Sequence, residues 1–525
     1  MFEYSLTSLE TRSADPQEDE MPINEQSAAA PVIIAGAGPT GLTLATELRR
    51  GGADVVLLER RPNREVEGSR AAGMQPRTIE MLDQRGIADR FLAEGPPSEL
   101  GNFAGIKLDY STLPSRFPYA LNIMQAETER VLEDVAAELG VAVRWSAEVT
   151  GVRQGGGGVE VCVEGPGGAQ TVSGSHLVGC DGGRSTVRKL IGAEFPGTDA
   201  TMVALIGDVE LDEPPQRPLF LERHERGLIT VIQFRPGWYR VVTVERERSA
   251  SPDDPVTIEE LRASARRVAG ADFGMHSPRW LSHFNDAIRQ ADRYRVGSVL
   301  LAGDAAHIHL PAGGQGMNMG MQDAFNLGWK LAAVSRGDAR DGLLDTYQAE
   351  RHAADADILK VIRAQSVLCE PGPRIGELYD IFTHLVGFDD VNRYLSTTLS
   401  GLDIRYPMPG ELPLLGRRVP DVDISSREGA KRVHDLLKPA RPVLLSFSAT
   451  TDVTKTAAPW AGRIDIATAD CLSDSWAVPG VGTVPASSAV LIRPDGYVAW
   501  TSGADPDLGA LHHALTTWCG PQCRG

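Results

Sequence analysis

The chain has 525 residues, of which 42% are hydrophobic and 23% charged, and its formal net charge is −18. This ordinary globular composition excludes disorder along the whole length, and no apolar run approaches the roughly 18 residues that a membrane helix needs. Because an acidic surface repels phosphate backbones, we expect a small molecule as the partner, and neither nucleic acid nor a membrane.

The first predicted elements follow a polar, acidic leader at residues 1–30, which lacks the pattern of a secretory signal and is expected to be disordered. Residues 32–35 form a short apolar run that suits a strand buried on both faces, and residues 42–50 carry apolar side chains along one helical face. A second buried strand at residues 55–58 ends at Glu59. Strand, glycine-rich turn, helix and strand in this order predict an α/β fold with a parallel sheet.

In the middle of the chain, predicted antiparallel strands are followed by predicted helices. Residues 141–180 and 200–250 alternate β-forming residues with turns rich in glycine, which predicts short antiparallel strands. Helical periodicity then returns at residues 322–334 and 343–368.

The last part of the chain begins with prolines between residues 407 and 420, which predict a linker. A strand at residues 443–447 and a hairpin at residues 489–500 then predict a compact α/β unit. Near the C-terminus, Cys519 and Cys523 are separated by three residues, whereas a thioredoxin-type redox motif has two, so we expect a frayed tail with two exposed thiols. The six cysteines show no metal-ligand spacing, and free thiols favour a cytoplasmic protein.

The first motif with a chemical meaning is Gly-Ala-Gly-Pro-Thr-Gly at residues 36–41, between the first strand and the helix. Its glycines permit a tight turn and close backbone approach, so a pyrophosphate can bind to amide groups at the helix start. Glu59 lies 18 residues after Gly41, near the spacing of a carboxylate that binds ribose hydroxyls. An acidic residue there favours NAD or FAD over NADP at this site.

Two later segments also run from a strand into a turn that contains an aspartate. Residues 178–188 place Asp181 before a predicted helix, and residues 300–307 place Asp304 before the glycine-rich segment 311–318. Each segment alone could be a capped helix start, but the three motifs in this order are much more specific.

Together these motifs resemble the single-component FAD-dependent aromatic hydroxylases with the p-hydroxybenzoate hydroxylase fold, especially the branch that hydroxylates aromatic polyketides. The resemblance covers the chain from Pro31 to the hairpin near Trp500. It implies a Rossmann-like FAD-binding domain interleaved with an antiparallel-sheet substrate domain, followed by a thioredoxin-like domain. Asp181 is implied, together with Arg188, to serve both FAD and the nicotinamide. The residues implied to hold the flavin are Gly36, Gly38, Pro39, Thr40, Gly41, Glu59, Arg60, Arg70, Gln125, Val149, Asp181, Asp304, Pro311, Gly314, Gly316, Met317 and Asn318.

The resemblance also implies how the chain is divided. The FAD-binding domain is expected to comprise residues 31–106, 120–190 and 292–370, and the substrate-binding domain residues 107–119 and 191–291. A helical connector at residues 371–404 and the thioredoxin-like domain at residues 405–525 follow. Because neither Cys471 nor the terminal pair recreates a redox motif, that last domain is expected to serve structure or homo-oligomerisation.

The implied activity is that of an NAD(P)H- and dioxygen-dependent monooxygenase, which hydroxylates a polycyclic, polyketide-type phenol through a flavin C4a-hydroperoxide. Only one dinucleotide fingerprint is present, so NADPH or NADH is expected as a transient co-substrate. Phe220, Phe234 and Trp238 are candidates to line an apolar substrate cavity. No catalytic side chain can be named from the sequence.

Other interpretations stay open or are disfavoured on specific grounds. The motifs do not distinguish hydroxylation from a Baeyer–Villiger reaction on a polyketide ketone, nor from a non-catalytic FAD-binding protein. Flavin-dependent halogenation is disfavoured, because none of the eight tryptophans forms a Trp-x-Trp motif. No metal site is expected at His307 and His309, because Asp304 is the only nearby carboxylate and the flavin motif already uses it.

Overall fold

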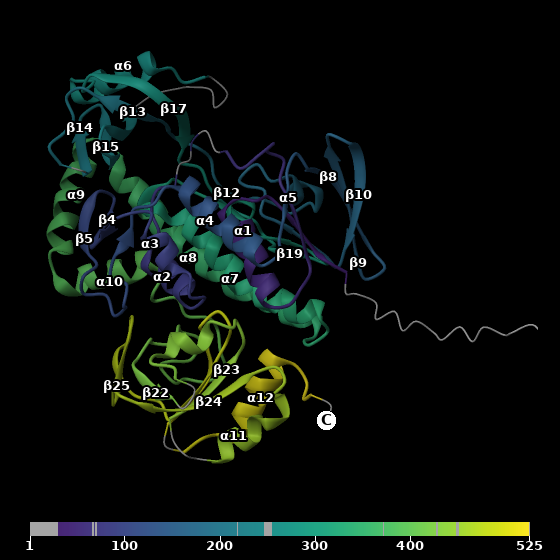
Figure 1. Ribbon diagram of the computed structural model, residues 1–525. Helices are drawn as coiled ribbons and strands as arrows, with labels where there is room; N and C mark the ends of the chain where they lie inside the picture. The colour runs from purple at the N-terminus through teal and green to yellow at the C-terminus, as the bar shows by residue number, and fades with distance from the viewer. Residues whose placement is uncertain are drawn as a thin grey trace, which may run out of the picture.

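The computed structural model describes residues 30–65, 68, 71–217, 219–245, 255–370, 372–426, 429–447, 451–503 and 505–523. The leader expected at residues 1–30 lies outside the described residues apart from Ala30. In Figure 1, the purple-to-green part of the chain forms a large upper body, and the yellow part forms a smaller unit beneath it. We refer to residues 30–404 as the upper body and to residues 405–523 as the C-terminal unit.

A six-stranded sheet lies at the core of the upper body. Its order is β19-β20-β11-β1-β2-β7, and all neighbours run parallel except the edge strand β19, which is antiparallel to β20. The two predicted strands coincide with β1 and β2, and β1 is buried at every position, as expected for a strand with both faces covered. The strand bounds are β1 Val32–Ala35, β2 Val55–Leu58, β7 Val143–Arg144, β11 His176–Gly179, β19 Arg295–Val296 and β20 Val299–Leu301.

Helices α1, α4 and α7 pack against this sheet, and α1 contacts both of the others. The long helix α7 is buried at every residue from 317 to 332, which makes it the central helix of the upper body. It begins seven residues before the predicted start at residue 322, because the glycine-rich turn leads directly into it. The helix bounds are α1 Pro39–Arg50, α2 Pro76–Asp83, α3 Ala88–Leu92, α4 Gln125–Glu138, α5 Thr186–Leu190, α7 Gln315–Ser335 and α8 Asp345–Cys369.

The antiparallel strands predicted at residues 141–180 form a separate three-stranded sheet of order β10-β9-β8. Its strands are β8 Glu148–Gly155, β9 Gly158–Gly165 and β10 Gly168–Gly174. The two ends of the same stretch join the parallel sheet as β7 and β11, because alternation of β-forming residues does not determine which strand becomes a neighbour.

A five-stranded antiparallel sheet of order β14-β15-β16-β13-β17 forms the top of Figure 1. One face packs on helix α6 (Ile258–Ala269), through residues such as Leu205 and Leu261. The other, which we call the inner face, packs on α7 and α8 through Ile206, Met319 and Ile362. The strand bounds are β13 Val203–Leu211, β14 Leu219–His224, β15 Gly227–Arg235, β16 Trp238–Glu245 and β17 Met275–Asn285.

The expected connector at residues 371–404 folds as two helices, α9 (Pro373–Val386) and α10 (Asp389–Ser400). They pack on a hairpin of β4 (Leu100–Phe103) and β5 (Ile106–Asp109). The domain boundary predicted between residues 106 and 107 therefore falls inside this hairpin. The remaining short strands of the upper body are β3 Pro97–Ser98, β6 Ala120–Leu121, β12 Gly197–Thr198, β18 Ile288–Gln290 and β21 His307–Ile308.

The C-terminal unit is a five-stranded sheet of order β22-β24-β23-β27-β28. Strand β23, helix α11 and the parallel strand β24 are followed by the antiparallel hairpin β27–β28 and helix α12. The thioredoxin-like assignment of this unit stays a prediction. The bounds are β22 Ile424–Ser426, β23 Val443–Ser446, α11 Thr451–Ala457, β24 Asp465–Cys471, β25 Ser475–Val478, β26 Gly482–Pro485, β27 Ala489–Ile492, β28 Val498–Ser502 and α12 Leu508–Cys519.

Two expectations for this unit were wrong. The proline-rich segment is packed rather than a free linker, since Leu414 and Val419 are buried in its core. The C-terminal tail as far as residue 523 is packed rather than frayed, since the indole of Trp460 donates to the carbonyl of Gly520 over 2.8 Å. Burial raises the pKa of Cys519 to about 12, so this thiol is not reactive near neutral pH. All six cysteines lie within the described residues and are free.

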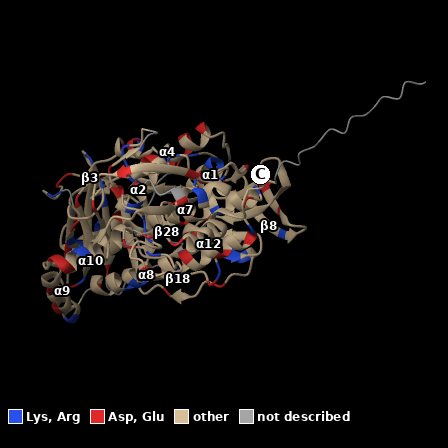
Figure 2. Ribbon diagram, turned by 90° about the horizontal axis from the view of Figure 1, so that it is seen from below, with Lys and Arg blue, Asp and Glu red and all other residues tan. Residues whose placement is uncertain are grey.

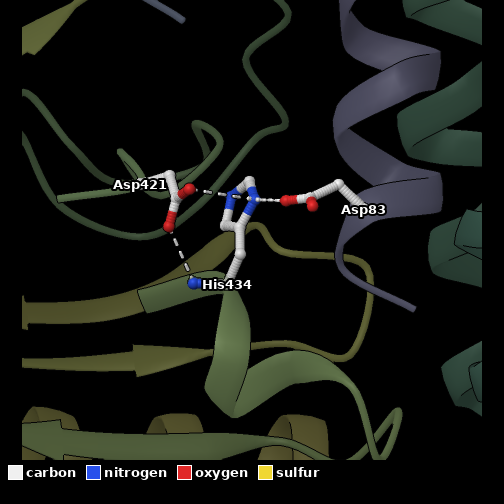
Figure 3. A group of neighbouring side chains, drawn as sticks. All are labelled: Asp83, Asp421 and His434. Carbon is white, nitrogen blue, oxygen red and sulfur yellow. Dashed lines mark hydrogen bonds and ion pairs between the residues drawn. The ribbon is translucent and has the colours of Figure 1, made fainter. Parts of the chain in front are cut away.

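Side chains from both parts meet beside the end of α2 (Figure 3). His434 of the C-terminal unit contacts Asp83 of α2, with Nδ1 3.0 Å from Oδ2, and its backbone N–H donates to Asp421 over 2.9 Å. This group has the composition of a metal-ligand set, but Arg432 lies 2.6 Å from a carboxylate oxygen of each aspartate. We therefore interpret it as an ion-pair network that joins the C-terminal unit to the upper body.

Figure 2, seen from below, shows basic and acidic residues interspersed along the ribbon. None of the helices in the described ranges combines the length and the apolar composition needed to span a bilayer.

Candidate flavin site

The three sequence-distant turns meet at the carboxyl ends of the neighbouring strands β1, β11 and β20. A Cβ atom on Gly36 of the first turn would lie 2.3 Å from the carbonyl oxygen of Cys180, which precedes Asp181. Arg188 of the second motif donates to the carbonyl oxygen of Ala305 in the third, over 2.8 Å. Carboxyl ends of parallel strands at such a switch point are the usual ligand position in an open α/β sheet.

Thr40 ties the first turn to the third. A Cβ on Gly303 would lie 2.5 Å from Oγ1 of Thr40, and a Cβ on Gly320 would lie 2.3 Å from the same atom. Both positions therefore require glycine. Gly303 opens the 3₁₀ turn η1 (Gly303–Ala305), and Gly320 lies in α7. The start of α1 is therefore seated directly against the segment that contains Asp304.

The glycine-rich turn has the shape of a phosphate cradle. A Cβ on Gly41 would lie 1.9 Å from the carbonyl oxygen of Gly36, so Gly41 is needed for packing of helix on strand. A Cβ on Gly38, in contrast, would meet no atom of the described residues within 4 Å, apart from its chain neighbours. Gly38 thus leaves an open approach to the start of α1, and the residues present fit the pyrophosphate of FAD.

Two long helices offer open amino ends at this place. Helix α1 is capped by Gly38 and helix α7 by Gly314, with no side-chain cap and no acidic residue in either first turn. Their free amide groups and helix dipoles favour an anionic or electron-rich ligand. Residues 312–314 form the 3₁₀ turn η2 (Ala312–Gly314), and the positive φ of +66° at Gly314 suits glycine.

Both carboxylate oxygens of Asp181 accept hydrogen bonds from protein groups. It accepts from the hydroxyl of Ser185 over 2.5 Å and from the amides of Thr186 and Val187 over 2.7 and 3.0 Å. It therefore fixes the start of α5, the capping role expected of a lone Asp at such a turn. A direct contact of this carboxylate with FAD stays a prediction.

Glu59 turns back toward the glycine-rich loop. Its Oε2 accepts from the amide of Ala37 over 2.7 Å, and its Oε1 lies 3.3 Å from the guanidinium of Arg61. Arg61 also contacts Glu129 of α4 at 3.0 Å, and Glu129 accepts from the Gln125 side chain over 2.8 Å. The predicted Arg60 is exposed, and its contact with FAD stays a prediction. Arg61, which the sequence analysis did not name, links Glu59 to Glu129, and adjacent arginines have no pattern that distinguishes them.

Val149 is the second residue of β8, in the three-stranded sheet beside this network. Two residues earlier, the amide N–H of Ala147 donates to the carbonyl oxygen of Glu59 over 2.8 Å. Val149 itself is buried. The backbone predicted to meet adenine therefore lies next to the carboxylate predicted to meet the adenosine ribose.

Asn318 ties the first turn of α7 to the chain that follows Arg70. It accepts from the amide of Gln75 over 2.8 Å and donates to the carbonyl oxygens of Gly73 and Gly314 over 3.1 and 2.7 Å. Its side chain is thus occupied by the protein, and a contact with the flavin would have to use its backbone. Arg70 itself lies outside the described residues.

The remaining predicted residues flank the start of α7. Asp304 and Pro311 are exposed, and Met317 is buried. A Cβ on Gly316 would lie 3.7 Å from Oδ1 of Asp304, so this carboxylate faces the first turn of the helix. The positions of these residues agree with the predicted flavin side, and their contacts with FAD stay a prediction.

The statement that Asp304 is the only carboxylate near His307 was wrong. His307 Nε2 lies 2.8 Å from Asp323 of α7 and 3.5 Å from Asp355 of α8, and all three side chains are fully buried. Arg351 bonds both carboxylates at 2.7 and 2.6 Å. The cluster joins the third motif to α7 and α8 as an ion-pair network. Both carboxylates come from helices that the sequence places far from His307.

This cluster makes stability depend on pH. Burial alone would lower the pKa of His307, but the carboxylates of Asp355 and Asp323 outweigh burial and raise the pKa from 6.5 to about 9. The folded protein therefore binds more protons than the unfolded chain between these values, so the stabilisation is complete below pH 6.5 and is lost as the pH rises through 9. Asp355, whose pKa burial raises to about 7, acts in the same direction at lower pH.

We expect the melting temperature of the wild type to fall as the pH is raised from about 6.5 to about 9, measured by differential scanning fluorimetry. In a His307→Asn variant, which has no titrating ring at this position, the fall over that window should be smaller. Parallel curves for the two proteins would contradict the assignment.

The predicted substrate residues lie on two different faces of the five-stranded sheet. Phe220 packs against Phe273 on the face under α6, with ring centroids 5.8 Å apart, and its role as a substrate residue stays a prediction. Phe234 lies beside Arg240, 5.1 Å from its guanidinium, and Arg240 pairs with Asp208 at 2.7 Å on the inner face. Alternation along a strand separates the two faces, but the sequence does not show which helix covers which face.

Trp238 also belongs to the inner-face side of strand β16. Its ring lies 4.8 Å from the guanidinium of Arg279, and its indole N–H is buried without a hydrogen-bond partner among the described residues. The ring of Trp280 lies 5.4 Å from the guanidinium of Arg240. Together with Phe234 and Trp238 it forms an aromatic wall.

Residues 29–361 match the family described as FAD binding domain, and residues 412–522 match the one described as aromatic-ring hydroxylase, C-terminal. The chain is 46% identical over 502 residues to a 12-dehydrotetracycline 5-monooxygenase/anhydrotetracycline 6-monooxygenase of Streptomyces rimosus, covering 93% of this chain and 99% of the relative.

A solved structure of an anhydrotetracycline hydroxylase from Streptomyces rimosus superposes with a TM-score of 0.87 at 46% identity, covering 94% of this chain and all of the other. A dialkyldecalin synthase of Streptomyces rugosporus is 39% identical over 499 residues, which cover 93% of this chain and 99% of the relative. The similarity therefore includes a protein whose name is not that of a monooxygenase.

Proposed function

The chain belongs to the FAD-binding aromatic-ring hydroxylases, and on that premise we propose that it is a flavin-dependent monooxygenase that hydroxylates a polycyclic, polyketide-type phenol with NAD(P)H and dioxygen. The observation that supports this most is the meeting of three distant turns at two uncapped helix starts, beneath the inner face of a sheet with aromatic residues. Full-length similarity to tetracycline monooxygenases supports the substrate class.

The residues divide into those that hold the cofactor and those that shape the space above it. Gly36, Gly38 and Gly41 would hold the pyrophosphate at the start of α1, and Glu59 would bind the adenosine ribose. The start of α7, from Gly314 onward, would direct its dipole at the flavin ring and stabilise negative charge there. When bound, FAD supplies the redox chemistry and the activation of dioxygen.

On the substrate side, the protein's task is to orient an aromatic ring and to exclude water. Phe234, Trp238 and Trp280 offer flat apolar surface. The indole N–H of Trp238, which has no hydrogen-bond partner in the part of the chain that the structure describes, offers a donor to a phenolic or carbonyl oxygen. The buried Arg240–Asp208 pair adds a fixed polar group to the same wall. We propose Phe234 and Trp238 as substrate contacts on this basis.

The test is an activity screen with the purified, FAD-reconstituted protein. NADPH or NADH oxidation is followed with and without a polycyclic phenol such as anhydrotetracycline, under isotopically labelled dioxygen. We expect the aromatic compound to stimulate oxidation at least tenfold, and the product to carry one labelled oxygen on an intact ring system.

Other outcomes would overturn the proposal in distinguishable ways. Labelled oxygen inserted next to a ketone carbon would indicate a Baeyer–Villiger reaction. FAD binding without nicotinamide oxidation under any substrate would indicate a non-catalytic flavoprotein, or a non-oxidative catalyst as the name of the dialkyldecalin synthase suggests for that relative.

A further inference from the structure

His309 follows strand β21 and faces the start of α7. Its Nδ1 lies 2.6 Å from the carbonyl oxygen of Leu310. Because a carbonyl oxygen can only accept, the ring proton must sit on Nδ1, and Nε2 is left with a lone pair. Burial lowers the pKa of His309, which keeps the ring neutral and preserves this lone pair as an acceptor.

The Nε2 atom is buried and has no hydrogen-bond partner within the described ranges. Buried polar atoms are nearly always paired, so an orphan acceptor at this position needs an explanation. One explanation is that the partner is a ligand rather than a protein group.

The surroundings of Nε2 restrict what that ligand can be. A Cβ on Gly316 would lie 3.6 Å from Nε2 of His309 and 3.7 Å from Oδ1 of Asp304. Two acceptors therefore face Gly316, which has no side chain, in the first turn of α7, where the helix has no side-chain cap. Acceptors beside free amide donors suit a chain of hydroxyl groups, because each hydroxyl both donates and accepts.

We propose that Nε2 of His309 accepts a hydrogen bond from a hydroxyl of the ribityl chain of FAD, next to Asp304. This inference rests on the proposed function, since it assumes that FAD occupies the site. His309 is then a positioning residue, which fixes the cofactor at the start of α7 and transfers no proton. The role differs from that of His307, whose Nε2 is bound by Asp323.

The test compares two substitutions that differ in one property. His309→Gln keeps an acceptor near the Nε2 position, whereas His309→Phe keeps the ring shape and removes the acceptor. The dissociation constant of FAD is measured by quenching of flavin fluorescence on titration with apoprotein. We expect the Gln variant to stay within about threefold of wild type and the Phe variant to bind FAD at least tenfold more weakly.

ADP serves as a matched ligand because it shares the nucleotide half of FAD and lacks the ribityl chain. Its affinity, measured by calorimetry, should be the same in all variants. His513→Phe, the same change at an exposed position of α12, should bind FAD as wild type does. His309→Leu provides a second variant without an acceptor if the Phe variant does not melt cooperatively.

Equal FAD affinity in the wild type and in the variants without an acceptor would overturn the proposal. So would equal weakening in the Gln and Phe variants, which would indicate a steric role, or a parallel loss of ADP affinity. Failure of the wild-type protein to bind FAD at all would instead overturn the proposed function.

Discussion

Replacement of Gly36 by alanine is expected to abolish FAD binding and to destabilise the apoprotein by about 3 kcal/mol or more. The backbone at Gly36 has a φ of +104°, and the added Cβ would lie 2.3 Å from the carbonyl oxygen of Cys180. Because the added Cβ would contact backbone atoms of Cys180, the first and second turns must separate to relieve this contact. The measurements are thermal melting of the apoprotein and fluorescence titration with FAD.

The matched control is Gly38→Ala in the same turn. Gly38 has a φ of −77°, which alanine adopts without strain, and within the part of the chain that the structure describes its Cβ would meet no atom beyond its chain neighbours within 4 Å. We expect the apoprotein to melt as wild type does, while FAD binds at least tenfold more weakly because the methyl group occupies the approach of the pyrophosphate. Unchanged FAD affinity in Gly38→Ala would show that the phosphates bind elsewhere.

Replacement of Arg493 by methionine is expected to lower the free energy of unfolding by about 3–5 kcal/mol. Arg493, in the hairpin of the C-terminal unit, bonds both oxygens of Glu350 on α8 at 2.6 and 2.9 Å and also pairs with Asp495. All three side chains are almost completely buried. Methionine would leave Asp495 as an uncompensated buried charge, and Glu350 with Lys330 as its remaining cation.

The comparison variant is Arg153→Met, at an arginine whose side chain is 79% exposed and lies 3.9 Å from Glu160. Surface pairs of this kind contribute little, so this change should shift the urea midpoint by less than a tenth of the Arg493→Met effect. If the two variants unfold alike, the C-terminal unit does not depend on this ion pair for its attachment to α8.

The candidate site was predictable wherever the backbone itself carries the function. Gly36 and Gly41 could be assigned from spacing because only glycine tolerates the close approaches that the structure shows at these two positions, and Gly38 completes the same spacing. Arg60 was named from the sequence and Arg61 was not considered, because the sequence does not show in which direction each of two adjacent arginine side chains points. That direction is set by Glu129, which lies on a helix far along the sequence.

The sequence by itself determined the strands at residues 32–35 and 55–58 and the turn between them. Their apolar runs can be buried only between two covered faces, and the glycine spacing fits one kind of turn. Tertiary structure alone decided that Phe220 lies under α6, that Cys519 is buried and that His307 meets Asp323 and Asp355. Periodicity records that a side chain is buried, whereas its partner depends on how distant helices pack around it.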